Sequence, residues 1–260
     1  MPCDVPCHLT KERQFLWNGT ADLVLFSFNQ GSEVDTLVAQ GAKKSHQHFA
    51  LSSMEPSTLF PDLSRPEYLK KFDLKATYHL DSDVPRIYLG HDRLNPETFL
   101  DFHWMTPPRA KRKDRLVSLV VSNCGKKDKN GRLRYMKELG KHVFIHSFGQ
   151  CLNNAKASDY MDEPMPDSHE RMRKRNRSLQ DVLRNCREKM ELIRTFKFHL
   201  ALENSDTPDY VTEKFGIALA AGTVPIVKSR KNNYHLFAPH PHSYVVAEDF
   251  ASPKVQTGLH

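Results

Sequence analysis

Four polar residues between positions 204 and 214 have the types and spacing of a binding site. Asn204 follows a strand-like stretch, and Tyr210, Glu213 and Lys214 are three and four residues apart, which predicts one face of a first helical turn. A lysine there is unfavourable by a few tenths to about 1 kcal/mol because it faces the positive end of the helix dipole. A bound anion would remove this penalty, and phosphate is the usual one. The residues therefore predict a nucleotide-diphosphate pocket; the alternative is a set of solvated surface side chains.

The surrounding sequence predicts a strand, a loop, a helix and a second strand. Apolar residues alternate over 196–202, which is the period of a strand that buries one face. Thr207 or Asp209 would cap the helix, and Gly222 suits the position just past its end, before the apolar run 223–227. Ligands bind outside the carboxyl ends of strands in open α/β sheets, so this unit would present its first loop to a ligand.

This segment closely resembles the donor-binding signature of the alpha-1,3-fucosyltransferases. The resemblance is carried by Asn204, Tyr210, Val211, Thr212, Glu213, Lys214 and the Ala-Gly-Thr-Val-Pro run at 221–225. Weaker similarity covers most of the chain, at 21–26, 54–55, 81–83, 122–124, 147–149 and 248–250. The resemblance implies an enzyme that transfers L-fucose from GDP-fucose, in alpha-1,3 linkage and with inversion, to a GlcNAc-containing glycan of glycoproteins.

The resemblance also assigns chemical roles to single residues. Glu55 matches the family's catalytic base, although Glu-Pro-Ser stands here where the family commonly has Glu-Ser-Pro. Lys214 and Arg132, with Arg134 as the alternative to Arg132, would neutralise the departing diphosphate. Glu213 is expected to act in catalysis as well as in binding. The implied donor-binding set is Arg132, Asn204, Tyr210, Glu213 and Lys214.

No cofactor is expected beyond the donor substrate GDP-fucose. Two cationic side chains can take the place of a metal at the diphosphate, and a divalent ion such as Mn²⁺ would at most stimulate the reaction. The run Asp81-Ser82-Asp83 matches the Asp-x-Asp pattern of a diphosphate metal site, but it lies in the acceptor half. A structural or acceptor-facing role is therefore expected for it. Cys3, Cys7 and His8 form an incomplete ligand set for structural zinc.

The alternation of strand-like and helix-like segments predicts an α/β fold with parallel sheets. The resemblance implies the GT-B arrangement, in which two Rossmann-like domains face a cleft. We expect an acceptor-side domain at 1–105, a basic, proline-containing linker at 106–115 and a donor domain at 116–260. The family normally continues beyond this point with a further helix, so the donor domain is expected to be truncated at its C-terminus.

The charge balance favours anionic partners. Lys and Arg number 38 against 31 Asp and Glu, a formal net charge of +7, which suits nucleotide sugars, acidic membranes or nucleic acid. The basic run at 171–177 keeps nucleic-acid binding as a minor alternative, but no nucleic-acid motif or interleaved aromatic residue accompanies it. We therefore expect no nucleic-acid partner. No apolar run is long enough to span a bilayer, so membrane attachment is expected only through an anchor absent from this chain.

The resemblance implies the Golgi lumen, and the cysteines and glycosylation motifs are consistent with it. Five cysteines leave one unpaired if two disulfides form; spacing does not decide the pairing, and Cys124 with Cys151 is a reasonable pair. Sequons at Asn18 and Asn176 permit a lumenal location. The main alternative function is a catalytically silent, truncated isoform that binds nucleotide or a partner. The acceptor, whether core N-glycan, Lewis-type or another, stays open.

Overall fold

The structure, a computed structural model, describes residues 6–89, 110–125, 127–161 and 186–253. The chain forms two compact units, Met1–Pro85 and Arg86–His260. The predicted boundary at residue 105 lies outside the described residues. The described end of the predicted linker packs on the second unit, because Lys111 Nζ donates to the Arg194 carbonyl at 2.8 Å and the Arg112 N–H donates to the Thr195 carbonyl at 3.1 Å. Residues 110–115 are therefore part of this unit and not a free linker.

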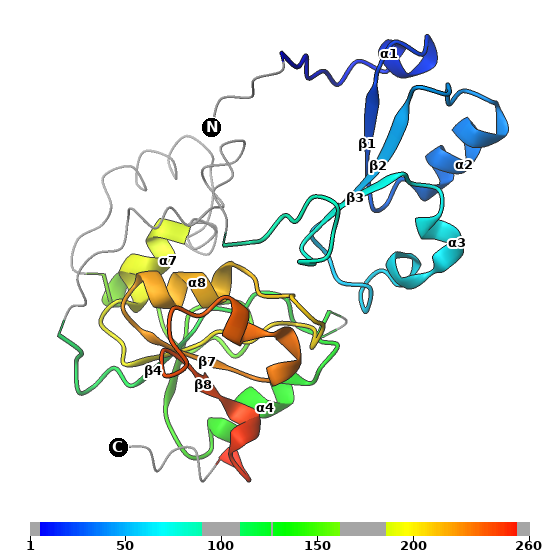
Figure 1. The fold of residues 1–260 in the computed structure, drawn as a ribbon. Helices are drawn as coiled ribbons and strands as arrows, with labels where there is room; N and C mark the ends of the chain where they lie inside the picture. The colour runs from blue at the N-terminus through cyan, green and yellow to red at the C-terminus, as the bar shows by residue number, and fades with distance from the viewer. Residues whose placement is uncertain (1–5, 90–109, 126, 162–185, 254–260) are drawn as a thin grey trace. The chain divides into compact units, whose positions relative to one another are not determined.

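The first unit is built on a three-stranded parallel sheet in the order β1-β2-β3. Its helices α2 and α3 lie on one side of the sheet (Figure 1), where Phe26, Phe49 and Leu51 are buried. Leu23 and Leu25 of β1 point to the other side and are more than half exposed. The elements are α1 (Gln14–Trp17), β1 (Leu23–Ser27), α2 (Gly31–Ala39), β2 (His48–Ser53), α3 (Pro66–Leu69) and β3 (Leu74–Thr77).

The second unit contains a five-stranded parallel sheet in the order β5-β4-β6-β7-β8. Its strands are β4 (Val117–Leu119), β5 (Ile145–Ser147), β6 (Phe198–Leu200), β7 (Val224–Val227) and β8 (Val245–Val246). The chain runs from β4 outward to β5 and then returns to the other side of β4 to form β6. The order therefore reverses between β4 and β6, which makes their carboxyl ends the topological switch point, the usual ligand position in such sheets.

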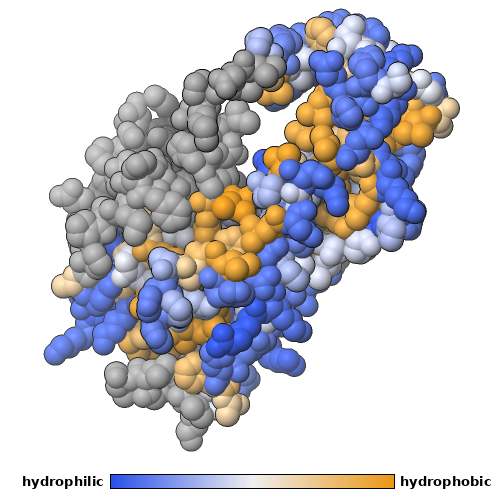
Figure 2. Space-filling model, in the orientation of Figure 1, coloured by the Kyte–Doolittle hydropathy of each residue, from blue (hydrophilic) through white to orange (hydrophobic). Residues whose placement is uncertain are grey.

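Helices cover both faces of this second sheet (Figure 1). Helix α4 (Arg132–Leu139) packs on one face with Val117, Leu119 and Ile226. Helices α7 (Cys186–Ile193) and α8 (Glu213–Ala220) pack on the other, around Phe196 and Phe215. This three-layer arrangement confirms the predicted α/β class with parallel sheets. Hydrophobic side chains also reach the surface of both units (Figure 2). Among the described residues, no helix is long and apolar enough to cross a membrane.

Helix α8 begins later than the sequence predicts. Its N-cap is Thr212, not Thr207 or Asp209. Asp209 has a φ of 62°, in the left-handed region, so the chain turns there and cannot continue as a right-handed helix. Tyr210 therefore lies before the helix. The prediction that it shares the first helical turn with Glu213 and Lys214 was wrong.

The end of α8 is where the sequence places it. Gly222 has a φ of 64°, a conformation that glycine adopts without steric cost. The Gly222 N–H donates to the Leu219 carbonyl and the Thr223 N–H donates to the Ala218 carbonyl, both at 2.9 Å. These two bonds form a Schellman motif, which satisfies the last carbonyls of the helix and leads the chain directly into β7.

Strand β6 is buried on both faces, whereas its alternating pattern predicts one buried face. His199 is 4% exposed, and its Nδ1 lies 2.9 Å from Ser118 Oγ on β4. Burial, together with the positive charges of Lys189 and Lys214, lowers the pKa of His199 to about 3. The imidazole is therefore a neutral hydrogen-bonding group in the sheet at physiological pH.

His199 should make the fold sensitive to acid. The unfolded chain binds a proton at this residue below about pH 6.5 while the folded chain does not, so the free energy of unfolding should fall by about 1.4 kcal/mol per pH unit from about pH 6 to 4. Urea unfolding at several pH values measures this slope. His199→Gln should make it shallower, and His142→Gln, at an exposed position, should not. An equally steep slope in the His199 variant would contradict the assignment.

Candidate functional site

Arg132 joins the two loops that leave the switch point. Its Nη1 donates to the Leu202 carbonyl after β6 at 2.8 Å, and its Nη2 donates to the Asn123 carbonyl after β4 at 3.2 Å. The residue is only 2% exposed. Burial lowers the pKa of the guanidinium, and the negative charges of Glu203 and Asp128 oppose this shift. Because arginine stays protonated in proteins, Arg132 places a fixed positive charge behind the end of β6.

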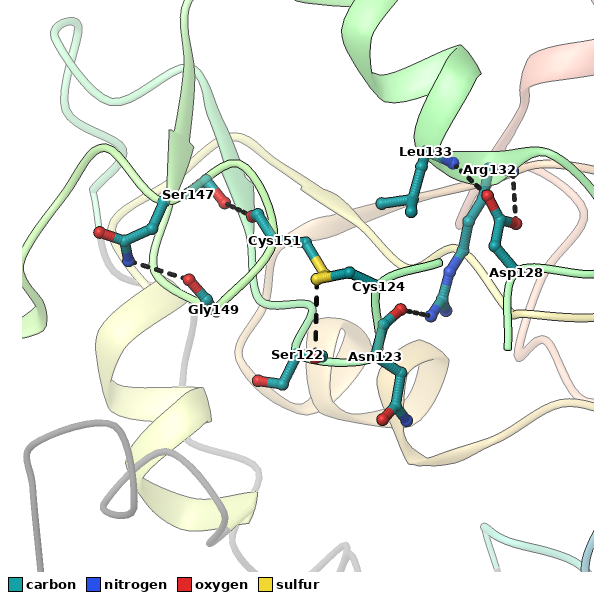
Figure 3. The surroundings of a disulfide bond; sticks show 10 residues. Ser122, Asn123, Cys124, Asp128, Arg132, Leu133, Ser147, Gly149 and Cys151 are labelled. Carbon is teal, nitrogen blue, oxygen red and sulfur yellow. Dashed lines mark hydrogen bonds between the residues drawn. A yellow bond between two sulfur atoms is a disulfide. The ribbon is translucent and has the colours of Figure 1, made fainter. Parts of the chain in front are cut away.

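The start of α4 fixes Arg132 in this position. Asp128 accepts hydrogen bonds from the backbone N–H groups of Arg132 at 3.0 Å and Leu133 at 3.1 Å (Figure 3). Two of the otherwise unpaired N–H groups of the helix are thereby satisfied. The bonds made by the Arg132 guanidinium go to backbone carbonyls, so its contact with phosphate stays a prediction. Arg134, the alternative, is exposed in the same helical turn.

A disulfide between Cys124 and Cys151 joins the loop after β4 to the loop after β5. Figure 3 shows this bond beside Asn123, whose carbonyl accepts the hydrogen bond from Arg132. The disulfide closes 27 residues of chain and confirms the pair that the sequence favoured. It therefore restrains one of the two loops that hold the guanidinium.

Lys214 is paired with Glu203 at the carboxyl end of β6. The Glu203 side chain is 1% exposed, and its Oε2 accepts hydrogen bonds from Lys214 Nζ at 3.0 Å and from Thr212 Oγ1 at 2.9 Å. Its Oε1 accepts the Thr212 N–H at 2.8 Å. The anion expected beside the first-turn lysine is thus a side chain of the same unit. This pairing explains why a cation is tolerated at the N-terminus of α8.

Glu213 adds a second carboxylate near the same ammonium group. Glu213 Oε1 lies 3.6 Å from Lys214 Nζ. Burial would raise the pKa of Glu213, but the positive charges of Lys214 and Lys189 outweigh it and lower the pKa. Burial likewise opposes the charge on Lys214, whose pKa is nevertheless raised by Glu203 and Glu213. The site therefore holds an ionised carboxylate and an ammonium group side by side.

Asn204 carries a buried polar atom that is open to a further partner. The residue is 8% exposed, and its Oδ1 accepts no hydrogen bond within the described part of the chain. Tyr210 is 4% exposed, and its ring centroid lies 5.9 Å from that of Tyr88. The structure thus gathers the predicted residues of the donor set around the end of β6, within one unit.

The sequence analysis did not identify several residues that hold this site together. Asn130 Nδ2 donates to Asp206 Oδ1 at 2.6 Å and to the Glu203 carbonyl at 3.1 Å. Lys228 Nζ donates to Asp206 Oδ2 at 2.7 Å. Glu203 is the one residue whose role the sequence could have indicated, since it is a charged residue directly after a buried strand. Burial of an unpaired charge is costly, so such a residue predicts a charged or hydrogen-bonding partner nearby.

Glu55 lies in the first unit, just beyond the carboxyl end of β2. Its backbone N–H donates to Ser53 Oγ at 3.1 Å. It borders a cavity of about 220 Å³ whose polar lining includes Ser53, Glu55, Ser57, Thr77, His79 and Asp81. The position beside a cavity is suitable for a base that acts on a bound hydroxyl group.

The Asp81-Ser82-Asp83 run contributes to this region in two ways. Asp83 Oδ2 accepts the Lys75 N–H at 2.8 Å, which is a structural contact, and Asp81 lines the cavity. Among the described residues, no group of three or more His, Cys, Asp or Glu side chains is placed to hold a metal ion.

Two sequence models of one family match almost the whole chain. "Glycosyltransferase family 10 (fucosyltransferase) C-term" matches residues 110–257, and "Fucosyltransferase, N-terminal" matches residues 3–89. The chain belongs to glycosyltransferase family 10. The two matches cover the main parts of the two units of this family 10 chain.

Curated relatives of this family 10 chain are named as fucosyltransferases. Mouse 4-galactosyl-N-acetylglucosaminide 3-alpha-L-fucosyltransferase 9 is 31% identical over 248 residues, which are 95% of this chain and 57% of the relative. Drosophila melanogaster Alpha-(1,3)-fucosyltransferase B is 28% identical over 229 residues, 86% of this chain and 47% of the relative. The chain thus spans about half the length of these relatives.

A solved structure shares the fold of the family 10 chain. The crystal structure of an alpha1,3-fucosyltransferase with GDP has a TM-score of 0.51 and 16% identity, and the match covers 90% of this chain and 62% of that one. At this identity the likeness supports the architecture, not the contacts of single residues.

The Cys124–Cys151 bond should stabilise the loop that holds Arg132. Closing a loop of 27 residues reduces the entropy of the unfolded chain, so Cys124→Ser/Cys151→Ala should lower the free energy of unfolding by about 3 kcal/mol in a urea titration. Cys7→Ser, at an exposed cysteine outside this bond, is the matched control and should not reproduce the loss. Equal stability of the double variant and the wild type would show that the bond does not stabilise the folded chain relative to the unfolded one.

Proposed function

We propose that this family 10 chain transfers L-fucose from GDP-fucose, in alpha-1,3 linkage and with inversion, to a GlcNAc-containing glycan of glycoproteins. The observation that carries the proposal is the arrangement of Asn204, Glu213 and Lys214 at the switch point of the second sheet. The names of the relatives support a 3-alpha-L-fucosyltransferase and give no support to nucleic-acid binding.

In the proposed donor site, positive charge faces the diphosphate of GDP-fucose. Lys214 Nζ has three N–H donors, of which Glu203 and Thr212 accept two, and its side chain is 24% exposed. The remaining donor is available to a phosphate oxygen. Arg132 would add its charge from the protein side, and Asn204 Oδ1 and Tyr210 would contact the nucleotide or the sugar.

Bond cleavage would separate charge between the fucose ring and GDP. As the bond to the diphosphate breaks, positive charge develops on the fucose ring and negative charge on the leaving phosphate. Lys214 would stabilise the phosphate, and the ionised carboxylate of Glu213 would face the sugar. Groups fixed in advance in this way are typically worth about 3 kcal/mol each to the transition state.

Glu55 would act as the general base in the same reaction. An inverting displacement needs one carboxylate, which takes the proton from the attacking hydroxyl group as the new glycosidic bond forms. The polar cavity beside Glu55 supports this assignment, because its hydroxyl and carboxylate groups could hold an acceptor sugar. We propose that no metal cofactor is required, since the cationic side chains supply charge at the diphosphate.

The proposed location is the Golgi lumen. The Cys124–Cys151 disulfide favours an oxidising compartment. Asn18, the acceptor residue of a glycosylation sequon, is exposed, which is a requirement for modification.

GDP and GDP-fucose should raise the melting temperature of the chain. A ligand at about 100 times its dissociation constant stabilises the folded state by about 2.7 kcal/mol, or roughly 5–10 °C for a chain of this size. GDP-mannose reports on selectivity for the sugar. Lys214→Ala should make the shift much smaller, whereas Lys141→Ala, at an exposed position, should keep it. If the wild type melts cooperatively but shows no shift, the donor-site proposal is wrong.

Glu55→Gln should reduce fucose transfer about 10²- to 10⁴-fold, because an amide cannot take the proton from the hydroxyl group of the acceptor sugar. The assay measures GDP release with and without a GlcNAc-containing acceptor, in buffer with and without EDTA. Glu67→Gln, on the surface of the same unit, should retain full activity. Equal turnover by wild type and Glu55→Gln would exclude Glu55 as the base. GDP binding without any turnover by the wild type would instead favour a catalytically silent form.

A further inference from the structure

Glu203 is the most deeply buried carboxylate of the donor region and accepts three hydrogen bonds. Two come from Thr212, through its N–H at 2.8 Å and its Oγ1 at 2.9 Å, and one comes from Lys214 Nζ at 3.0 Å. The Glu203 backbone is fixed as well, since its carbonyl accepts Asn130 Nδ2 at 3.1 Å. One side chain therefore joins the end of β6 to the N-terminus of α8.

We propose that Glu203 is a positioning residue, which holds the Lys214 ammonium group and the first turn of α8 where they can meet a diphosphate. This inference rests on the proposed function. Glu203 itself is too buried to reach a ligand, so it would act through Lys214, which is partly exposed.

The cost of burying Glu203 argues for a role beyond stability. Removal of two charges from water is unfavourable before their attraction is counted, and a well-packed apolar pair often stabilises a protein equally well. What the ion pair adds is a defined position for one charged group. Lys214 also donates to Thr212 Oγ1 at 2.6 Å, so two acceptors fix the direction of its ammonium group.

The charges around Lys214 make the proposal testable by pH. The charged groups that act on Lys214 are Glu203 on the β6 loop, Glu213 on α8 and Arg132 on α4. His199 on β6 and Lys189 on α7 belong to the same cluster. Burial and Arg132 disfavour the ammonium form of Lys214, while Glu203 and Glu213 favour it. Loss of the Glu203 charge should leave Lys214 easier to deprotonate.

The experiment measures GDP affinity by calorimetry for wild type and Glu203→Gln, from about pH 7.5 to 9.5, a range that lies below the usual lysine pKa. Glutamine keeps the size and one acceptor for the Thr212 N–H. We expect wild-type affinity to change little over this range and the variant to lose at least about 10-fold toward the alkaline end. Glu138→Gln, at an exposed ion pair, should behave as wild type.

A double-variant cycle tests whether Glu203 acts through Lys214. In a Lys214→Met background, Glu203→Gln should have no further effect on GDP affinity, because the group that it positions is absent. A purely structural residue would weaken binding equally in both backgrounds. Parallel pH profiles of wild type and Glu203→Gln, or equal losses in both backgrounds, would overturn the proposal.

Glu203→Asp provides the test if Glu203→Gln does not fold. Aspartate keeps the charge but shortens the reach, so GDP affinity should fall while its pH profile stays flat. Wild-type affinity in this variant would overturn the proposal. If the wild type itself binds no GDP, the proposed function fails and this inference fails with it, whereas normal wild-type binding with an unaffected variant rejects only the role of Glu203.

Discussion

The second unit depends on a buried negative charge that must be matched where β6 ends. Glu203 is 1% exposed, so its carboxylate needs hydrogen-bond donors from its surroundings, and Thr212 and Lys214 supply all three. This requirement holds the start of α8 against the end of β6. It also brings Lys214 to the position at which open α/β sheets bind ligands.

Arg132, on α4, fixes the loops that follow β4 and β6. Its guanidinium binds the carbonyls that follow β4 and β6, while Asp128 secures the start of its helix and the Cys124–Cys151 bond restrains the adjacent loop. Negative charge at the start of a helix is favourable, which suits Asp128 at this end of α4. The two helices that begin at the switch point are thus both anchored by charged side chains of the chain itself.

The proposed function divides the chemistry of a glycosyl transfer between the two units. The second unit holds the charged groups suited to a nucleotide diphosphate, and the first holds Glu55 beside a polar cavity. Family 10 models match the main part of each unit. Within each parallel sheet, polar residues that follow different strands meet at the carboxyl ends, which explains why Arg132, Asn204 and Lys214, far apart in the chain, gather in one region of the second unit.

The sequence by itself determined the features that depend on neighbouring residues. Strand periodicity, the glycine at position 222 and the alternation of helices and strands gave the β6–α8–β7 unit and the parallel α/β class, because these signals act over one or two turns of chain. Tertiary structure decided the rest. The left-handed Asp209 delayed the start of α8, the central position of β6 buried His199, and Glu203 became the anion beside Lys214. Burial and ion pairing depend on which strands become neighbours, and no local pattern in the chain specifies that order.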